Sequence, residues 1–191
     1  MAASTLIFIS GGVRSGKSSF AERIAIEIAR EKDGQLIYLA TGVTSDSEMK
    51  ERIETHQRDR KMGPYKWKTI ERSVQIAGIA DVINNQDIIL LDCVTTLLNN
   101  ELFFTERTWD EPFLKTVKED IITGIISIKN RAGTMIVVSN EVLNESLQGK
   151  DIVFEYGRLL GQIHQELIKV ADQAYLVEAG IPIVMKGERK C

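Results

Sequence analysis

The 191-residue chain contains only two cysteines, Cys93 and Cys191, and only two histidines, His56 and His164. The cysteines lie far apart, with no CxxC spacing and no histidine cluster beside either, which argues against a zinc site or a disulfide framework. We therefore interpret Cys93 as a small buried residue. Any histidine chemistry must fall on one of two side chains.

Basic residues are not in excess. Lys and Arg number 24 against 27 Asp and Glu, for a net charge of -3. Nucleic-acid-binding surfaces usually carry a marked surplus of Lys and Arg, so this balance predicts no nucleic-acid partner. An anionic ligand would have to bind at a local site, since the chain has no general excess of positive charge.

Long apolar segments are also missing. The first residues, "MAASTLIFIS", have no basic n-region, and their apolar run is far too short for a signal peptide or a membrane span. We expect no membrane insertion and a cytoplasmic location. The chain is 43% hydrophobic and 27% charged, without linkers or repeats, and this predicts one compact domain over residues 1–191.

Short apolar runs alternate with longer helical patterns. The runs cover residues 5–9, 35–40, 87–92, 134–138 and 174–179. The longest helical patterns cover about 109–131 and 151–171. Uninterrupted apolar strands separated by helices predict an α/β fold with a mainly parallel sheet flanked by helices. The final stretch, "AYLVEAGIPIVMKG", predicts a hairpin at the sheet edge, turning at Gly180.

The segment "GGVRSGKS" matches the phosphate-loop motif G-x-x-x-x-G-K-[ST] between a strand and a helix. Glycines allow successive backbone N–H groups to face phosphates, Lys17 reaches the outer phosphates, and the Ser18 hydroxyl can ligate Mg²⁺. An ordinary glycine-rich turn is the alternative. We predict a nucleotide-binding loop, in a P-loop NTPase-like fold, made by Gly11, Gly12, Val13, Arg14, Ser15, Gly16, Lys17 and Ser18.

Other strand ends should meet at the same place, because ligands of open parallel sheets bind outside the carboxyl ends of the strands. Asp92 ends "IILLD", where an acidic residue can serve Mg²⁺; the alternative is a cap for a helix beginning near Val94. The segments at 40–42 and 139–141 end two further strands. The sequence thus predicts one crevice lined by four strand ends.

The stretch "RIETHQRDR" places His56 four residues from both Arg52 and Arg60 on one face of an expected helix. Neighbouring cations favour a neutral, nucleophilic imidazole and would also attract a triphosphate. His56 could equally be an ordinary core or surface residue. We interpret the other histidine, His164, as a helix residue at the boundary of an apolar face, and Trp67 and Trp109 as packing residues.

A series of motifs runs through the chain in order: "ISGGVRSGKSSFAE", "YLATG", "RIETHQRDR", "WKTIE", "LLDCVTTLLNN", "VVSNEV" and "GRLLGQIHQELIKVADQAYLVEAGIP". Together they resemble the bifunctional adenosylcobinamide kinase and adenosylcobinamide-phosphate guanylyltransferase family of cobalamin biosynthesis. The chain departs from the family pattern after residues 140–142, where the family has a glycine-rich segment ending in proline.

The resemblance implies two reactions. A nucleoside triphosphate, GTP or ATP, phosphorylates adenosylcobinamide; GTP then guanylylates His56, and GMP passes to adenosylcobinamide phosphate. It also implies Mg²⁺ as cofactor and a homo-oligomer, expected to be a trimer. Two simpler functions stay open, a small-molecule phosphate-loop kinase and a nucleotide-dependent switch protein.

The resemblance further assigns His56 and Lys17 to catalysis and extends the nucleotide contacts beyond the loop. The added positions are Ala40, Thr41, Gly42, Gln57, Arg58, Asp59, Arg60, Glu71 and Asp92. A carboxylate can accept from guanine N1–H and N2–H₂ together, which would select GTP over ATP. The residues alone do not separate this guanine role of Asp92 from its Mg²⁺ role.

Overall fold

The computed structural model describes residues 4–42, 63, 65–141 and 152–187. Its strands are β1 (Thr5–Gly11), β2 (Leu36–Ala40), β3 (Trp67–Glu71), β4 (Ile88–Asp92), β5 (Thr134–Asn140), β6 (Gln173–Glu178) and β7 (Ile181–Lys186). Its helices are α1 (Lys17–Lys32), α3 (Val94–Phe103), α4 (Glu111–Arg131), α5 (Ile152–Val170) and the 3₁₀ helix η1 (Ile76–Val82).

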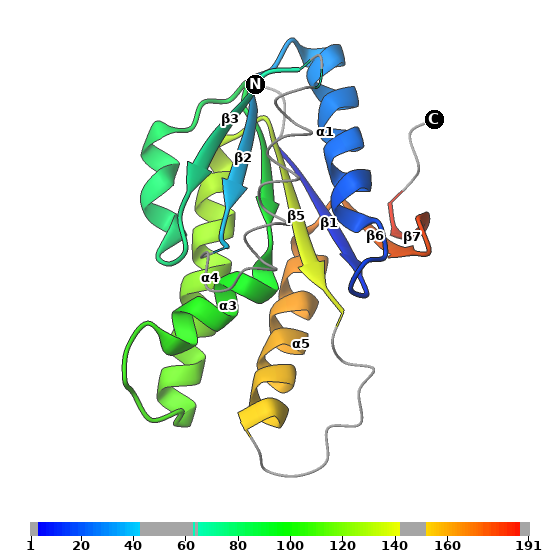
Figure 1. The fold of residues 1–191 in the computed structure, drawn as a ribbon. Coiled ribbons are helices and arrows are strands. Elements are labelled where there is room, and N and C mark those ends of the chain that lie inside the picture. The colour runs from blue at the N-terminus through cyan, green and yellow to red at the C-terminus, as the bar shows by residue number, and fades with distance from the viewer. Residues whose placement is uncertain (1–3, 43–62, 64, 142–151, 188–191) are drawn as a thin grey trace.

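The strands form one sheet in the order β3-β2-β4-β5-β1-β6-β7. Every neighbouring pair is parallel except β6 and β7, which are antiparallel. The predicted α/β fold, parallel sheet and terminal hairpin are confirmed (Figure 1). The sequence analysis missed β3 among the strands, because this edge strand "WKTIE" is too exposed to carry a continuous apolar run.

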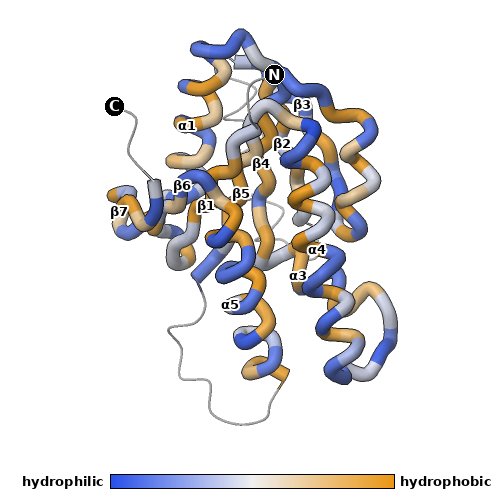
Figure 2. Tube along the Cα trace, turned by 180° about the vertical axis from the view of Figure 1, so that it is seen from behind, coloured by the Kyte–Doolittle hydropathy of each residue, from blue (hydrophilic) through white to orange (hydrophobic). Residues whose placement is uncertain are grey.

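Alternate residues of the central strands face opposite layers, as the strand period requires. Ile7, Ile9, Leu90 and Val138 lie on the face covered by α1. Leu6, Phe8, Leu91 and Val137 lie on the face covered by α3, α4, α5 and η1. Both faces are buried, which explains why these strands read as unbroken apolar runs, coloured orange in Figure 2.

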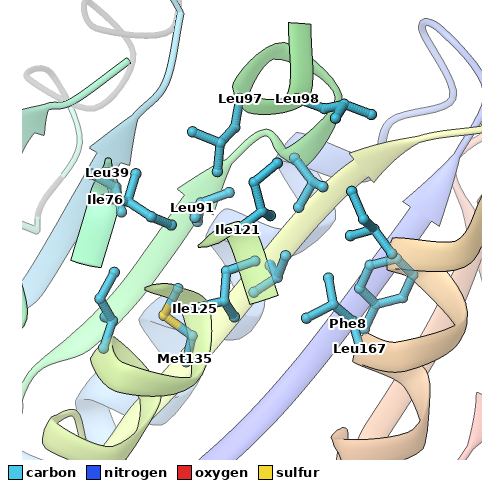
Figure 3. Packing of buried hydrophobic residues seen from close by; sticks show 14 of the residues in the cluster. Phe8, Leu39, Ile76, Leu91, Leu97, Leu98, Ile121, Ile125, Met135 and Leu167 are labelled. Atoms are coloured by element: carbon cyan, nitrogen blue, oxygen red, sulfur yellow. The ribbon is translucent and has the colours of Figure 1, made fainter. Parts of the chain in front are cut away.

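The larger core lies between the sheet and the four-helix layer. In Figure 3, side chains of α3 and α4 such as Leu97 and Ile121 point toward Leu91 and Met135 of the strands, and Leu167 of α5 meets Phe8. All of these side chains are buried. On the other face, α1 presents mostly small residues, Ala21, Ala25 and Ala29, which lets this helix lie close to the sheet.

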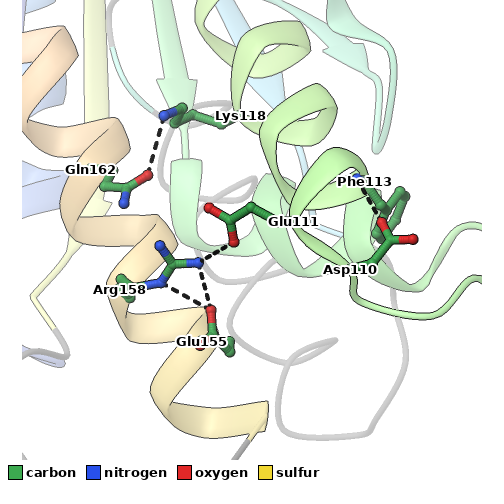
Figure 4. A network of polar contacts seen from close by, with 7 residues as sticks. All are labelled: Asp110, Glu111, Phe113, Lys118, Glu155, Arg158 and Gln162. Atoms are coloured by element: carbon green, nitrogen blue, oxygen red, sulfur yellow. Dashed lines mark hydrogen bonds and ion pairs between the residues drawn. The ribbon is translucent and has the colours of Figure 1, made fainter. Parts of the chain in front are cut away.

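Polar contacts join α4 and α5 outside this core. Arg158 of α5 pairs with Glu155 at 2.7 Å and with Glu111 of α4 at 2.9 Å (Figure 4). Lys118 donates to Gln162 at 3.2 Å. Asp110 caps α4 by accepting from the Phe113 N–H at 2.9 Å. Exposed ion pairs of this kind add little to stability, so packing against the sheet positions the two helices.

Within the described ranges, no helix is both long enough and apolar enough to cross a membrane. The described elements also cover most of the patterns expected as helices, since α4 and α5 begin and end within two residues of the predicted limits. The helix expected around His56 falls on residues that lie outside the described part of the chain.

The two-layer core makes a testable prediction. Ile125 of α4 is fully buried, so Ile125→Ala should lower the free energy of unfolding by about 2–5 kcal/mol through lost burial and a cavity. Ile181→Ala in β7, where the side chain is 65% exposed, should cost less than about 0.5 kcal/mol. Urea denaturation measures both; equal losses would contradict the assigned core.

Candidate functional site

The carboxyl ends of β1 to β5 lie along one edge of the sheet, where the arrowheads point in Figure 1. The register places Ala40 beside both Glu71 and Asp92, and Gly11 beside Asn140. Residues 11, 40, 71, 92 and 140, which are far apart in sequence, therefore share one edge. The predicted convergence of strand ends is confirmed.

The segment from Gly11 to Ser18 leaves β1 at this edge and enters α1. Gly16 has φ +89°, a left-handed conformation that glycine adopts readily. The buried Lys17 side chain folds back over the loop and donates to the Gly12 carbonyl at 2.9 Å. Ser18 lies half-buried in the first turn of α1. The loop thus presents a lysine and a helix N-terminus at the sheet edge, a favourable combination for phosphate.

Two neighbouring strands fix where the loop begins. The Glu141 N–H, just beyond β5, donates to the Gly11 carbonyl at 2.8 Å. A β-carbon on Gly11 would lie 2.4 Å from the Val177 carbonyl oxygen of β6. Gly11 is therefore pressed between β5 and β6, and a larger residue there would displace the loop.

The two predicted acidic residues share the sheet face that α1 covers. Asp92 follows Leu90 by two positions on that face and accepts from the Tyr38 hydroxyl at 3.1 Å. Glu71, the exposed end of β3, follows Trp67 by four positions and shares the face too. The alternative of Asp92 as a helix cap is wrong, because Cys93 occupies the cap position of α3.

The Thr41 side chain lies inside the fold at the end of β2, and the nucleotide contact predicted for this residue stays a prediction. Its side chain is fully buried, and its hydroxyl donates to the Cys93 carbonyl at 2.9 Å and accepts from the Cys93 N–H at 2.8 Å. Asn100 donates to the Thr41 carbonyl at 2.8 Å. Thr41 therefore ties the end of β2 to the residue after Asp92, which aligns Ala40 and Gly42 at the edge. Cys93 is buried, as predicted.

Comparison with known proteins decides which phosphate-loop proteins this chain resembles. The family model "Cobinamide kinase / cobinamide phosphate guanyltransferase" matches residues 7–185. The chain belongs to this family. The "bifunctional adenosylcobalamin biosynthesis protein CobU" of Salmonella typhimurium is 31% identical over 189 residues, covering 95% of this chain and 99% of the relative. The protein of the same name from Escherichia coli is 29% identical over 188 residues, with the same coverage.

A solved structure supports the fold of this family member. A KaiC-like protein from Pyrococcus horikoshii superimposes with a TM-score of 0.52, covering 99% of this chain and 82% of the other. The two sequences are only 13% identical, so the likeness extends to the fold alone.

Some of the predicted site residues of this family member have no described position. His56, its neighbour Arg52, and the segment of Gln57, Arg58, Asp59 and Arg60 lie outside the described residues. Their assignment stays a prediction.

On the opposite face of the sheet, the second histidine is not at a boundary but inside the core. His164 is 6% exposed, packs edge-on against Phe8 and bonds through Nε2 to the Ser139 hydroxyl at 2.7 Å. The Ser139 hydroxyl lies 3.2 Å from that of Thr95, which accepts from the Asn140 N–H at 2.8 Å. This chain of bonds supports the end of β5. Burial lowers the pKa of His164 to about 4, so the ring is neutral near pH 7.

The sequence analysis missed several residues that shape the site. Tyr38 reaches Asp92 from the next strand, and the hairpin residues Val177 and Gly180 touch the phosphate loop from the far end of the chain. None of these contacts has a local signature, because each joins strands that pair only in the folded sheet. The packing roles predicted for Trp67 and Trp109 are confirmed by their edge-on contacts with Tyr38 and Phe103.

The buried histidine makes stability depend on pH. The unfolded chain binds a proton at His164 below its ordinary pKa near 6.5, whereas the folded chain resists protonation until about pH 4. Stability should therefore fall as the pH drops from about 6.5 to 4, by about 3 kcal/mol from this residue alone.

His164→Gln should remove this component, so the difference in unfolding free energy between the wild type and the variant should shrink as the pH falls through this window. Urea denaturation at several pH values measures the two curves. Curves that stay parallel between pH 7 and 4 would contradict the burial of a neutral His164.

Proposed function

We propose that this member of the family carries out both transfers along the carboxyl edge of its sheet, and that GMP passes through a covalent bond to His56. One observation carries the proposal. The glycine-rich loop with Lys17, and the acidic residues Asp92 and Glu71, lie at the carboxyl edge of the sheet, beside the face that α1 covers. Phosphates bind at residues 11–18, and the nucleoside extends along the strand ends toward Glu71.

The kinase step needs positioning more than covalent chemistry. The hydroxyl of adenosylcobinamide attacks the γ-phosphorus of the nucleotide, an O–P bond forms, and the bond to the bridging β,γ-oxygen breaks to release the nucleoside diphosphate. Lys17 and the backbone N–H groups of the loop stabilise the negative charge on the phosphate oxygens.

The guanylyl step uses the other end of the triphosphate. A neutral His56 nitrogen attacks the α-phosphorus of GTP, and the α,β-bridging bond breaks to release pyrophosphate. A phosphate oxygen of adenosylcobinamide phosphate then attacks the same phosphorus, breaks the P–N bond and frees the histidine. The product is adenosylcobinamide-GDP. Arg52 and Arg60 keep the imidazole neutral and offset phosphate charge.

Asp92 and Glu71 lie at different distances from β1, the strand that leads into the phosphate loop, and this difference suggests a different role for each. Adjacent strands lie about 4.8 Å apart, so the end of β4 is about 10 Å from β1 and the end of β3 about 19 Å. Asp92 is thus close to the phosphates and Glu71 close to the base. We assign Asp92 to the magnesium end and Glu71 to recognition of the guanine edge.

The residues present fit a magnesium ion. Among the described residues, no three acidic, histidine or cysteine side chains are grouped to hold a metal by themselves. Mg²⁺ in nucleotide sites is held by one or two protein oxygens together with phosphates and water, so a larger cluster is unnecessary. Ser18 and Asp92 would hold the ion, and it would offset charge on the bound phosphates.

Labelling tests the covalent step. The protein incubated with α-labelled GTP should acquire a stoichiometric, acid-labile label, because a phosphoramidate hydrolyses in acid. His56→Ala should abolish the label. His164→Gln is the matched control, since it alters the only other histidine and should leave labelling intact at neutral pH. The absence of label while GTP binds would favour a plain kinase, and binding without any transfer would favour a switch protein.

Glu71 supplies a second test. Glu71→Gln replaces an acceptor-only carboxylate by an amide and should lower the affinity for GTP by about tenfold to a hundredfold, with little change for ATP. Glu27→Gln, an exposed residue on α1, is the matched control and should change neither. Equilibrium titration with both nucleotides measures this. Equal losses for GTP and ATP would contradict a role in reading guanine.

A further inference from the structure

The turn of the terminal hairpin lies directly against the phosphate loop. The Gly180 N–H donates to the Ser15 carbonyl at 2.8 Å. A β-carbon on Gly16 would lie 3.2 Å from the Gly180 α-carbon, and one on Gly11 would lie 2.4 Å from the Val177 carbonyl oxygen. The N–H and α-carbon of Gly180 and the carbonyl oxygen of Val177 thus all lie close to the loop, although some 160 residues separate the hairpin from the loop in sequence.

The bond from Gly180 fixes the plane of one particular peptide. In a planar trans peptide, the C=O and N–H groups point in opposite directions. A Ser15 carbonyl that is held toward the hairpin therefore turns the Gly16 N–H away from it, into the loop. The Ser15 N–H is itself bonded to the Gly12 carbonyl at 3.2 Å, so both peptides of Ser15 are held.

We propose that the backbone N–H of Gly180 is a positioning group for the phosphate loop, because it holds the Ser15 carbonyl outward and so directs the Gly16 N–H toward a bound phosphate. This inference rests on the proposed binding of nucleotide at residues 11–18. It makes the last hairpin part of the nucleotide site without direct contact to the ligand.

Strand pairing and the geometry of the turn fix the position of the Gly180 N–H relative to β1. β6 pairs in register with β1, Leu176 beside Ser10, so the turn stands just beyond the start of the loop. Ala179 and Gly180 both have positive φ, +48° and +81°, as a two-residue hairpin turn requires. β7 then returns along β6, with Ile181 beside Glu178. The turn is therefore anchored to the same sheet as β1.

A single-atom change tests the role of this N–H. Translation in vitro with glycolic acid at position 180 replaces the amide by an ester, which removes the donor and leaves the chain otherwise intact. Lactic acid at position 179 is the matched control: it makes the same change one residue earlier in the turn, where the N–H does not bond to Ser15. Circular dichroism and thermal denaturation are measured first, to check that both ester proteins fold.

Binding of GTP, inorganic tripolyphosphate and guanosine is then measured for each protein. We expect the ester at 180 to bind GTP and tripolyphosphate about fivefold to tenfold more weakly, with guanosine binding unchanged, and the ester at 179 to match the unmodified protein. The KM for GTP should rise more than kcat falls. A merely structural defect would instead lower kcat through loss of active enzyme and leave KM alone.

Gly180→Ala, made by ordinary expression, gives a second measure. A β-carbon there meets no atom within 4 Å, but φ +81° is strained for alanine, so the turn should shift and weaken tripolyphosphate binding. Unchanged phosphate affinity in both the ester at 180 and Gly180→Ala would overturn the proposal. If the unmodified protein bound no GTP, the proposed function itself would fail, and the positioning role with it.

Discussion

Parallel pairing of β1 with β5 and β6 is the constraint on which the rest of the structure depends. It places Gly11 at the sheet edge between the Glu141 N–H and the Val177 carbonyl, so the glycine-rich loop begins in a slot that only glycine fits. Parallel strands also bring every carboxyl end to that edge. A shift of one residue in this register would exchange the side chains that face α1 with those that face the opposite helix layer, and would move Gly11 out of its place between β5 and β6.

The two faces of the sheet serve different purposes at this edge. Asp92 and Glu71 lie on the α1 face, and Lys17 lies in the first turn of α1 beside it, so the charged residues of the proposed nucleotide site gather there. On the opposite face, His164 and Ser139 form a buried chain of hydrogen bonds that reaches the Asn140 N–H through Thr95. The neutral network on this second face holds the end of β5, and its polar groups would be costly to leave half-satisfied in a core.

Much of this could be predicted from the sequence. Continuous apolar runs identified the buried strands, and the motif at residues 11–18 identified the loop, because both signals are local. β3 was missed since an exposed edge strand has no such run. The burial of His164 was missed because its partner, Ser139, lies 25 residues away on another element. The support given by Gly180 has no local pattern at all, as it arises only when β6 pairs with β1.

We propose that guanylyl transfer at this edge of the sheet proceeds in two steps through a covalent histidine intermediate, beside a conventional phosphoryl transfer. The stereochemistry at the α-phosphorus tests this most directly. With GTP carrying sulfur at one α-oxygen, transfer to adenosylcobinamide phosphate through a covalent intermediate takes two in-line displacements. We predict overall retention of configuration in the product. Overall inversion would mean a single direct displacement and would contradict the account.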